Sequence, residues 1–420
     1  MQTLDLLGSF SRVETPFVKV QIGKYTFGVY TKETSPIYEN NNSVIYHQHR
    51  VQYPNFIKDL QIKKINGQVN QYTLQIVYPV VQGADPNFFE KVFSSVVKTR
   101  KIVFSYGDLS VPSFIYKNEE AIITGVKSNV SAATAVISYT VTAVSSVRLT
   151  SATKKDFQAK YCQPSSRIMW LLENNEEFGL QDIFFGMRDI AKVKADGLIR
   201  TDDAPVQLEY KANMSVLDYL LYCVDSMVYS GDNLNSNKLS AFYSLVIYDD
   251  TSGEYDGPYF KIMKVDKNQE HPEAYTIDIG YPSQNIVTKF DINTDEGYSL
   301  LYDYSEELDP EHYVYRVNTK GEMEEIYSPI VSSGNNHFET KSDDKIWWSK
   351  VTQFPVTVTL TLKGLLRPAI LMTYVKLNVY FYGAKHVASG LYVITQQVDQ
   401  VGLNGFTTTL TMLKISGDSD

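Results

Sequence analysis

Cysteine is nearly absent from this sequence. Only two of the 420 residues are cysteine, Cys162 and Cys223, and they lie in unrelated contexts. So few thiols exclude a disulfide framework and favour reduced side chains in a protein made in a cytoplasm. We expect both cysteines to pack as small apolar residues.

An excess of positive charge is also missing. The formal net charge is −9, and no run of Lys and Arg forms a basic stripe, which proteins need in order to hold nucleic-acid phosphates. The longest apolar run, 368–383, carries Lys376 and is shorter than the ~20 residues that cross a bilayer. The N-terminus lacks the basic and apolar regions of a signal peptide. We therefore expect no specific binding of nucleic acid and no membrane insertion by this chain.

Motifs of catalysis and metal binding are missing as well. The phosphate-loop, zinc-protease and nucleophile-elbow spacings do not occur. His47 and His49 would share one face of a strand, but no further His or Cys completes a zinc motif, so two surface histidines are favoured. The acidic run 248–257 lacks the residue order of a calcium loop, and the carboxylates of 304–312 are interpreted as a charged surface loop. The sequence predicts no enzyme, no cofactor and no metal site.

Aromatic residues, by contrast, are abundant. The 31 Tyr and 20 Phe favour strands and contact surfaces. From residue 15 to about 147, short alternating runs between turn residues predict antiparallel sheet. One helix interrupts them, with Asp85 expected as its cap and Pro86 as its first residue. The apolar face of that helix would hold Phe89, Val92, Phe93 and Val96.

The periodicity becomes helical between residues 164 and 231. Helices are predicted within 164–175, 179–193 and 213–231. In the last of these, Ser215 and Asp218 have the spacing of a capping box, and Gly231 is expected to close the helix. The apolar face of this helix holds Leu217, Leu220, Leu221, Val224 and Val228.

Strands return after the helices. Runs 243–250 and 259–265 predict a hairpin, and the Gly, Asn and Ser residues near 333–345 indicate a boundary. In 356–362 apolar residues alternate with threonine, and 390–413 holds two strand-like runs around Asn404 and Gly405. Threonine suits a strand with one polar face, because it combines β-branching with a hydroxyl. The candidate interface or channel-facing residues are Thr357, Thr359, Thr361, Thr407, Thr409 and Thr411.

Two short segments echo each other. FVKVQI at 17–22 and YVKLNV at 374–379 match in residue class, and each precedes a hairpin with an Asn-Gly pair. Duplication of a barrel explains the echo, and so does chance, since alternating strands resemble one another by construction.

These observations predict a mainly β fold with α+β parts: two tube-type β-barrel domains plus a helical and mixed insertion. The expected domains are a first barrel at 1–150, an α-rich domain at 151–240, a mixed β and loop domain at 241–345, and the second barrel's strands at 346–420.

Several stretches then follow one another in a distinctive order. They are a β-rich start with PFVKVQI, the strand SYTVTAVSS, the helical PSSRIMWLL and SVLDYLLYCVDSM, and the ending SGLYVITQQVDQVGLNGFTTTLTML. In this order they resemble the baseplate or tail hub proteins of tailed bacteriophages. The hub module of type VI secretion spike proteins is similar. The ending is the most specific part of the likeness.

The resemblance implies a structural protein of the virion, made in the host cytoplasm and located at the baseplate or tail tip. It would form a homotrimeric ring in which two barrels per chain give six-fold pseudosymmetry. That ring would join a hexameric tail tube to a trimeric spike or tip and leave a channel for DNA. Its partners would be the tail tube or distal tail protein, the tape measure protein and the spike or tip protein.

The wall of such a channel is expected to be neutral to acidic, because fixed cations would hold the DNA in place. Two other functions remain open. One is a glycan-binding, adhesin-like β protein that stacks its tyrosines on sugars. The other is an acid/base glycosidase that uses the carboxylates of 303–311, which ranks third.

Overall fold

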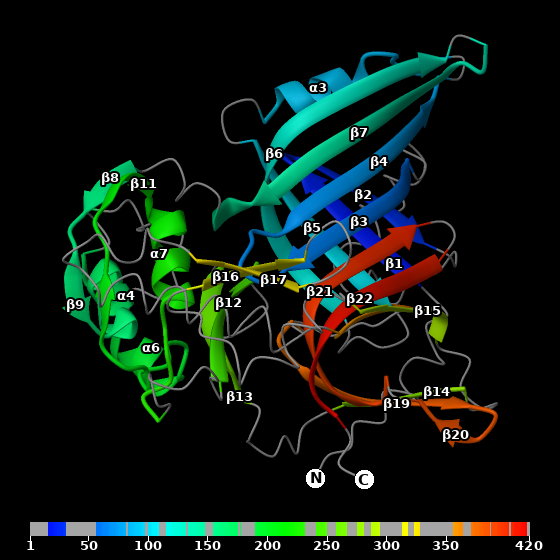
Figure 1. Ribbon diagram of the computed structural model, residues 1–420. Helices are drawn as coiled ribbons and strands as arrows, with labels where there is room; N and C mark the ends of the chain where they lie inside the picture. Colours follow the sequence, from blue (N-terminus) through cyan, green and yellow to red (C-terminus); the bar gives the residue numbers. More distant parts are fainter. Residues whose placement is uncertain are drawn as a thin grey trace.

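The computed structural model describes residues 16–30, 56–80, 83–96, 100–108, 115–131, 133–147, 154–174, 177, 190–231, 241–249, 258–266, 275–280, 287–294, 313–317, 323–327, 356–363, 371–386, 388–402 and 405–417. The fold is mainly β, as predicted, with a few short helices (Figure 1). The histidines at 47 and 49, the acidic run at 250–257, the carboxylates of 304–312 and the boundary at 333–345 lie outside the described residues.

One large sheet organises the chain. A first half contributes β1 (Pro16–Ile22), β2 (Tyr25–Tyr30), β3 (Ile57–Ile65), β4 (Gln71–Pro79), β5 (Lys101–Asp108), β6 (Ile115–Ser131) and β7 (Val136–Ser145). A second half contributes β14 (Tyr275–Ile279), β15 (Val287–Thr294), β18 (Val356–Leu362), β19 (Tyr374–Phe381), β20 (Ala384–Lys385), β21 (Gly390–Gly402) and β22 (Gly405–Gly417). The order of the 14-stranded sheet is β15-β18-β22-β21-β3-β4-β7-β6-β5-β1-β2, and β19 branches from β21 to pair with β14 and β20.

In the described part of the chain, one strand pair joins the two halves into a single sheet. Strand β21 runs antiparallel to β3, with Gln396 opposite Ile65 and Gly402 opposite Asp59. Each half has its own apolar core, because alternate residues of its strands point inward. Val401 and Phe406 of the second half lie in the core of the first. The pair therefore joins the sheets and locks the two cores together.

The two halves repeat one arrangement. In the first half, β6 and β7 shift register between Ile123 and Gly125; in the second, β21 and β22 shift between Ile394 and Gln396. Each bulge centres on a threonine, Thr124 or Thr395, whose hydroxyl donates to a threonine carbonyl on the next strand at 3.2 Å. A bulge is a position-specific feature, so this match indicates equivalent strands.

A second pair of bulges supports the same equivalence. β3 and β4 shift between Ile57 and Asp59, and β15 and β18 shift between Val287 and Lys289. The order β3-β4-β7-β6-β5 thus corresponds strand for strand to β15-β18-β22-β21-β19. The sequence echo had paired β1 with β19, whereas the structure aligns β19 with β5. The repeat is present, but between other strands than the echo indicated.

A short helix covers the first half. Helix α3 (Phe88–Ser94) buries Phe88, Phe89 and Val92 against the core. Its predicted start at Pro86 with Asp85 as cap was wrong: the N-cap is Asn87. The Asp85 carboxylate instead accepts a hydrogen bond from the backbone N–H of Asn87 at 3.0 Å, which forms a turn before the helix.

A separate helical core lies beside the sheet. It contains α4 (Pro164–Glu173), α6 (Ile190–Ala195) and α7 (Val216–Asp225), with the strand pairs β8 (Lys154–Phe157) with β11 (Lys211–Ser215) and β9 (Lys160–Cys162) with β10 (Val206–Leu208). The predicted cap of α7 is confirmed, since the Ser215 hydroxyl accepts from Asp218 N at 3.0 Å. Closure at Gly231 was wrong. The helix ends at Asp225, and Tyr229 already forms an isolated β-bridge with Asp203.

The two cysteines belong to this region and are free thiols. Cys223 is buried in the helical core, and burial raises the pKa of its thiol to about 12. Burial also raises the pKa of Cys162. Both side chains pack as small apolar residues and are poor nucleophiles.

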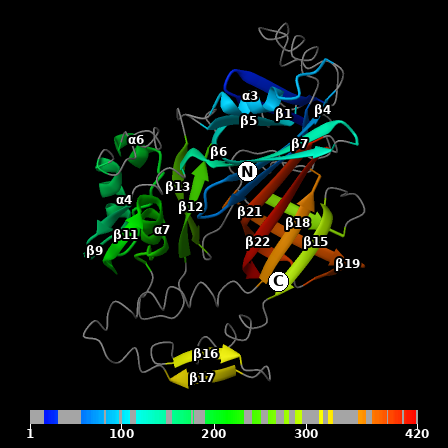
Figure 2. The ribbon, with the colours of Figure 1, turned by 90° about the horizontal axis from the view of Figure 1, so that it is seen from above.

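A two-faced hairpin connects the helical core to the sheet. Strands β12 (Ala241–Tyr248) and β13 (Tyr259–Asp266) pair antiparallel, as predicted. One face, with Tyr243, Leu245 and Ile247, enters the helical core. The other face places Val246 and Val265 in the core of the second half. Figure 2 shows the hairpin between the two regions.

The remaining described strands form one small pair, β16 (Tyr313–Val317) with β17 (Met323–Tyr327). Among the described residues no helix is long and apolar enough to cross a membrane. The domain limits at residues 150, 240 and 345 stay a prediction.

We expect Leu217→Asp to unfold the helical core. Leu217 is 4% exposed, and a carboxylate at this position would be buried among apolar side chains at a cost on the order of 3–5 kcal/mol. Thermal unfolding and limited proteolysis of the variant measure the effect. Ala212→Asp, at an exposed position of β11, adds the same charge to the same region and should leave both unchanged. A Leu217→Asp protein as stable as its parent would contradict the assignment of this face.

Candidate functional site

The predicted threonines form rows on one face of the sheet. The register of β18 and β22 sets Thr359 opposite Thr411 and Thr361 opposite Thr409, and the hydroxyl oxygens of the latter pair lie 3.2 Å apart. Thr357 lies opposite Leu413, and Thr407 lies opposite Gln400. The other face of both strands is buried, with Val358, Leu360, Leu362, Leu410 and Met412 in the core of the second half. The role of the threonines at an interface or channel stays a prediction.

The threonine rows continue across eight neighbouring strands. We call the resulting surface the polar face, and the strand registers define it. Its members are Lys289, Asp291 and Asn293 of β15; Thr357, Thr359 and Thr361 of β18; Thr407, Thr409 and Thr411 of β22; Gln396, Val398 and Gln400 of β21; Asp59, Gln61 and Lys63 of β3; Gln71, Thr73 and Gln75 of β4; Ser138, Thr140 and Thr142 of β7; and Gly125, Lys127 and Asn129 of β6. The same registers place the apolar residues Ile65, Val77, Val144 and Leu413 on this side of the sheet.

Uncharged hydroxyl and amide groups dominate the polar face, and its charges nearly balance. Three lysines oppose two aspartates, a difference of 3 − 2 = +1. Lys289 pairs with Asp291, and the Gln400 amide donates to the Asp59 carboxylate at 3.1 Å. Sequence reasoning found only the threonine part. Gln71, Thr73 and Gln75 of β4 and Gln396 and Gln400 of β21 also occupy alternate positions, a pattern that likewise predicts a strand with one polar face.

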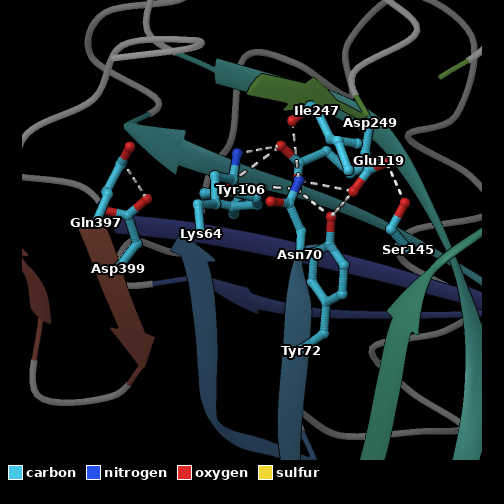
Figure 3. Close-up of polar contacts among 10 residues, drawn as sticks. All are labelled: Lys64, Asn70, Tyr72, Tyr106, Glu119, Ser145, Ile247, Asp249, Gln397 and Asp399. Atoms are coloured by element: carbon cyan, nitrogen blue, oxygen red, sulfur yellow. Dashed lines mark hydrogen bonds and ion pairs between the residues drawn. The ribbon is translucent and has the colours of Figure 1, made fainter. Parts of the chain in front are cut away.

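Behind the polar face, a group of charged side chains is buried inside the first half (Figure 3). Lys64 of β3 and Glu119 of β6 form an ion pair of 2.6 Å, with side chains 8% and 1% exposed. The Tyr106 hydroxyl lies 3.3 Å from both Glu119 oxygens. A buried ion pair is costly to break, because the remaining partner would be an uncompensated charge.

A second carboxylate reaches this group from the end of β12. Asp249 accepts a hydrogen bond from the Ser145 hydroxyl at 2.5 Å and from the Asn70 amide at 2.7 Å. The Tyr72 hydroxyl oxygen lies 3.0 Å from Asp249 Oδ2 and 3.0 Å from Glu119 Oε2. One hydroxyl proton serves one carboxylate only. The Tyr72 hydroxyl therefore lies between two buried carboxyl groups and donates to one of them at a time.

The turn between β3 and β4 contacts the same strand. Gly67 N donates to the carbonyl of Leu245 at 2.9 Å, and the Asn66 amide contacts the Ser244 hydroxyl. Gly67 has φ +70°, a conformation that favours glycine. The predicted Asn-Gly turn therefore exists, and its backbone fixes β12 to the first half.

Burial changes the acidity of two carboxyl groups here. Burial raises the pKa of Asp249 to about 6, and the charge of Glu119 adds to the effect. Burial also raises the pKa of Asp399 to about 7, although Lys64, the Thr408 hydroxyl and the Gln397 amide oppose the shift. Thr408 and Gln397 donate to the Asp399 carboxylate at 2.7 Å and 2.6 Å. Sequence reasoning missed both residues, because a single Asp in a strand carries no periodic signal.

The arrangement is built for structural joining. In the part of the chain that the structure describes, no three His, Cys, Asp or Glu residues are placed to hold a metal ion. The buried groups contact one another across β3, β4, β6, β7, β21 and the end of β12, and so hold the first half, the β12–β13 hairpin and the second half in one geometry. The amide oxygen of Asn70 is buried without a hydrogen-bond partner among the described residues.

Comparison with known proteins identifies the fold. No protein-family model and no curated protein matches the sequence. Among solved structures, the 43 kDa tail protein of prophage MuSo2 from Shewanella oneidensis matches 94% of this chain and 96% of its own, with TM-score 0.51 and 8% identity. A tail protein from Neisseria meningitidis MC58 matches 95% and 96%, with TM-score 0.49 and 9% identity.

A third neighbour is the c3393 protein of E. coli, a type VI secretion component described as similar to the T4 bacteriophage tail proteins gp27 and gp5. It matches 86% of this chain and 74% of its own, with TM-score 0.42 and 9% identity. Structural neighbours of this chain are thus phage tail and type VI secretion proteins. At such identity the likeness establishes the fold: this chain has the fold of the MuSo2 tail protein.

The buried carboxyls predict how stability depends on pH. A carboxyl whose pKa is higher in the folded chain contributes stability that is complete below its unfolded pKa, near 4, and is lost as pH rises through the folded pKa. For Asp249 and Asp399 this window extends from about pH 4 to about 6 and 7. Asparagine does not ionise, so the Asp399→Asn variant does not lose stability at this position as the pH rises. Relative to its parent, the variant should gain on the order of a few kcal/mol between pH 4 and pH 8.

Urea unfolding of parent and variant at pH 4, 6 and 8 measures this gain. The quantity followed is the difference in the free energy of unfolding between variant and parent as the pH changes. A constant effect of the amide on stability does not alter this pH dependence. Asp225→Asn, at an exposed position on α7, is the matched control. A difference that stays flat, or that falls as pH rises, would show that Asp399 is ionised in the folded chain at low pH.

Proposed function

We propose that this protein is the structural hub of a phage tail tip or baseplate. Three chains form a ring that joins the hexameric tail tube to a trimeric spike or tip and leaves a channel for DNA. The observation that carries the proposal is the polar face. It extends without interruption across two repeated four-stranded units of one chain.

The repeat supplies the symmetry that such a joint requires. Strands β3-β4-β7-β6 and β15-β18-β22-β21 share their order and their two bulges. Three chains therefore present six similar units. A trimer with this internal repeat matches a hexamer on one side and a trimer on the other.

The chemistry of the polar face suits the wall of a conduit. Hydroxyl and amide side chains keep the wall wet, and the near balance of lysine and aspartate leaves little net attraction for phosphates. DNA would pass such a wall without being held. The expected neighbours in the virion are the tail tube or distal tail protein, the tape measure protein and the spike or tip protein.

The glycan-binding alternative is not retained. Sugar-stacking tyrosines have to be exposed. Among the described residues Tyr161, Tyr210 and Tyr382 are exposed, whereas Tyr72, Tyr106, Tyr139, Tyr219 and Tyr392 are among the largest fully buried side chains. These rings fill the cores.

Assembly tests the proposal directly. We expect the purified protein to form three-fold rings in electron microscopy and trimers in mass photometry, either alone or with its spike partner. Rings would show a central channel with six similar outer units. A protein that stays monomeric alone and with the spike partner would overturn the hub function.

The channel wall gives a separate prediction. The parent should bind duplex DNA weakly, and Thr359→Lys combined with Thr411→Lys should produce salt-sensitive binding, because the trimer would gain six cations on one wall. Filter binding at low and high salt measures it. Gln158→Lys combined with Ala159→Lys, two exposed residues between β8 and β9, adds the same two cations away from the polar face and controls for the change of net charge. Tight, salt-sensitive binding by the parent would contradict a non-binding channel.

A further inference from the structure

Two strand edges at opposite ends of the eight-stranded unit have no strand beside them in the described part of the chain. Strand β5 pairs with β6 only as far as Ile122, so the outer edge of residues 124–131 is open. Among the described strands β15 pairs only with β18, so no described strand lies along its other edge. Open edges carry unpaired backbone N–H and C=O groups and readily accept another strand.

The repeat shows what each edge corresponds to. The counterpart of β6 is β21, and the counterpart of β15 is β3. Within the chain, β21 and β3 pair with each other over residues 396–402 and 59–65. The edges of β6 and β15 are thus equivalent to the edges of β21 and β3, which pair with each other inside each molecule.

We propose that β6 of one chain pairs antiparallel with β15 of a second copy, in the register of the internal β21–β3 pair. This inference rests on the proposed ring. The matched bulges align Asn129 with Gln400 and Asp291 with Gln61. Because Gln400 lies opposite Gln61, Asn129 lies opposite Asp291 of the second copy.

The rest of the register follows from this pair. Lys127 lies opposite Asn293, and Val130 lies opposite Phe290. The pairing ends at Val130. The next residue, Ser131, corresponds to Gly402 of the internal pair, where a Cβ would approach the Lys58 carbonyl oxygen to 2.6 Å. Serine has such a Cβ, so the equivalent close approach cannot form. Like charges directly opposite each other destabilise a strand pair, and this register contains no such pair.

Exposed apolar side chains gather at the same two edges. Val126 is 43% exposed, Val130 is 67% exposed, and Ile292 is 38% exposed. The β6–β7 and β15–β18 registers place all three on the core side of their strands. In the internal pair, Val401 and Leu60 occupy the positions equivalent to Val130 and Phe290 and are fully buried. Pairing between copies would bury the exposed valines and isoleucine as the internal pair does.

Occupation by a second copy also continues an existing surface. The polar face reaches β6 at one end and β15 at the other, so each new pair extends it into the next chain. Three such pairs close the wall with no open edge, which is the condition for a stable ring of strands.

Disulfide trapping tests the register. The double variant Asn129→Cys with Asp291→Cys should form a covalent trimer under mild oxidation, because directly opposed Cα atoms lie within the ~4.4–6.8 Å that a disulfide spans. The control Asn129→Cys with Asn293→Cys moves the partner by two residues on the same face, to a diagonal distance of about 7–8 Å. The covalent trimer should be lost in the control. Each single variant controls for the native cysteines.

The outcomes separate the two proposals. Trimeric rings without the Asn129–Asp291 crosslink, or with preferential crosslinking in the shifted control, would overturn this pairing and leave the hub function standing. Monomers without crosslinks, with or without the spike partner, would overturn both.

A second variant tests the pairing without cysteine. Val130→Asp should abolish trimers, since it places a charge against Phe290, yet leave the thermal unfolding of the chain unchanged because Val130 is exposed. Ala133→Asp, at the exposed tip of the same hairpin, should leave trimers intact. Trimers of unchanged stability in Val130→Asp would count against the pairing.

Discussion

The backbone pair between β21 and β3 is the contact on which the rest of the structure depends. It makes one sheet of two halves, carries Val401 and Phe406 into the core of the first half, and places Asp399 near Lys64 and Glu119. Without it the polar face would be two separate patches. The buried charges lie where the two halves and β12 converge. The side chains whose burial costs the most desolvation free energy are therefore the ones that hold these three parts together.

The helical core depends on that joint through β12. This strand contacts the turn at Asn66 and Gly67, ends in Asp249 among the buried groups, and shares its two faces between two cores. A displacement of β12 would therefore disturb three parts of the molecule at once. The hairpin therefore ties the helical core to both halves of the sheet.

Much of the fold could be predicted from local patterns, because alternation and capping are local. The hairpin of β12 and β13, the cap at Ser215 and the buried side of β18 follow from a few neighbouring residues. The start of α3 could not be placed, since Asp85 satisfies a turn as readily as a cap. The buried carboxyls Asp249 and Asp399 and the true repeat depend on contacts between distant strands, and one sequence carries no local trace of them.

The matched bulges at Thr124 and Thr395 also constrain how this chain can vary. Each adds one residue to its strand, so each sets which side chains beyond it look outward. Deletion of Thr124 alone would turn Lys127 and Asn129 toward the core side of β6 and place Val126 and Val130 on the polar face. Insertions and deletions are thus tolerated in the turns of these hairpins but not within the strands, and the two halves can diverge freely in residue type while staying tied in length.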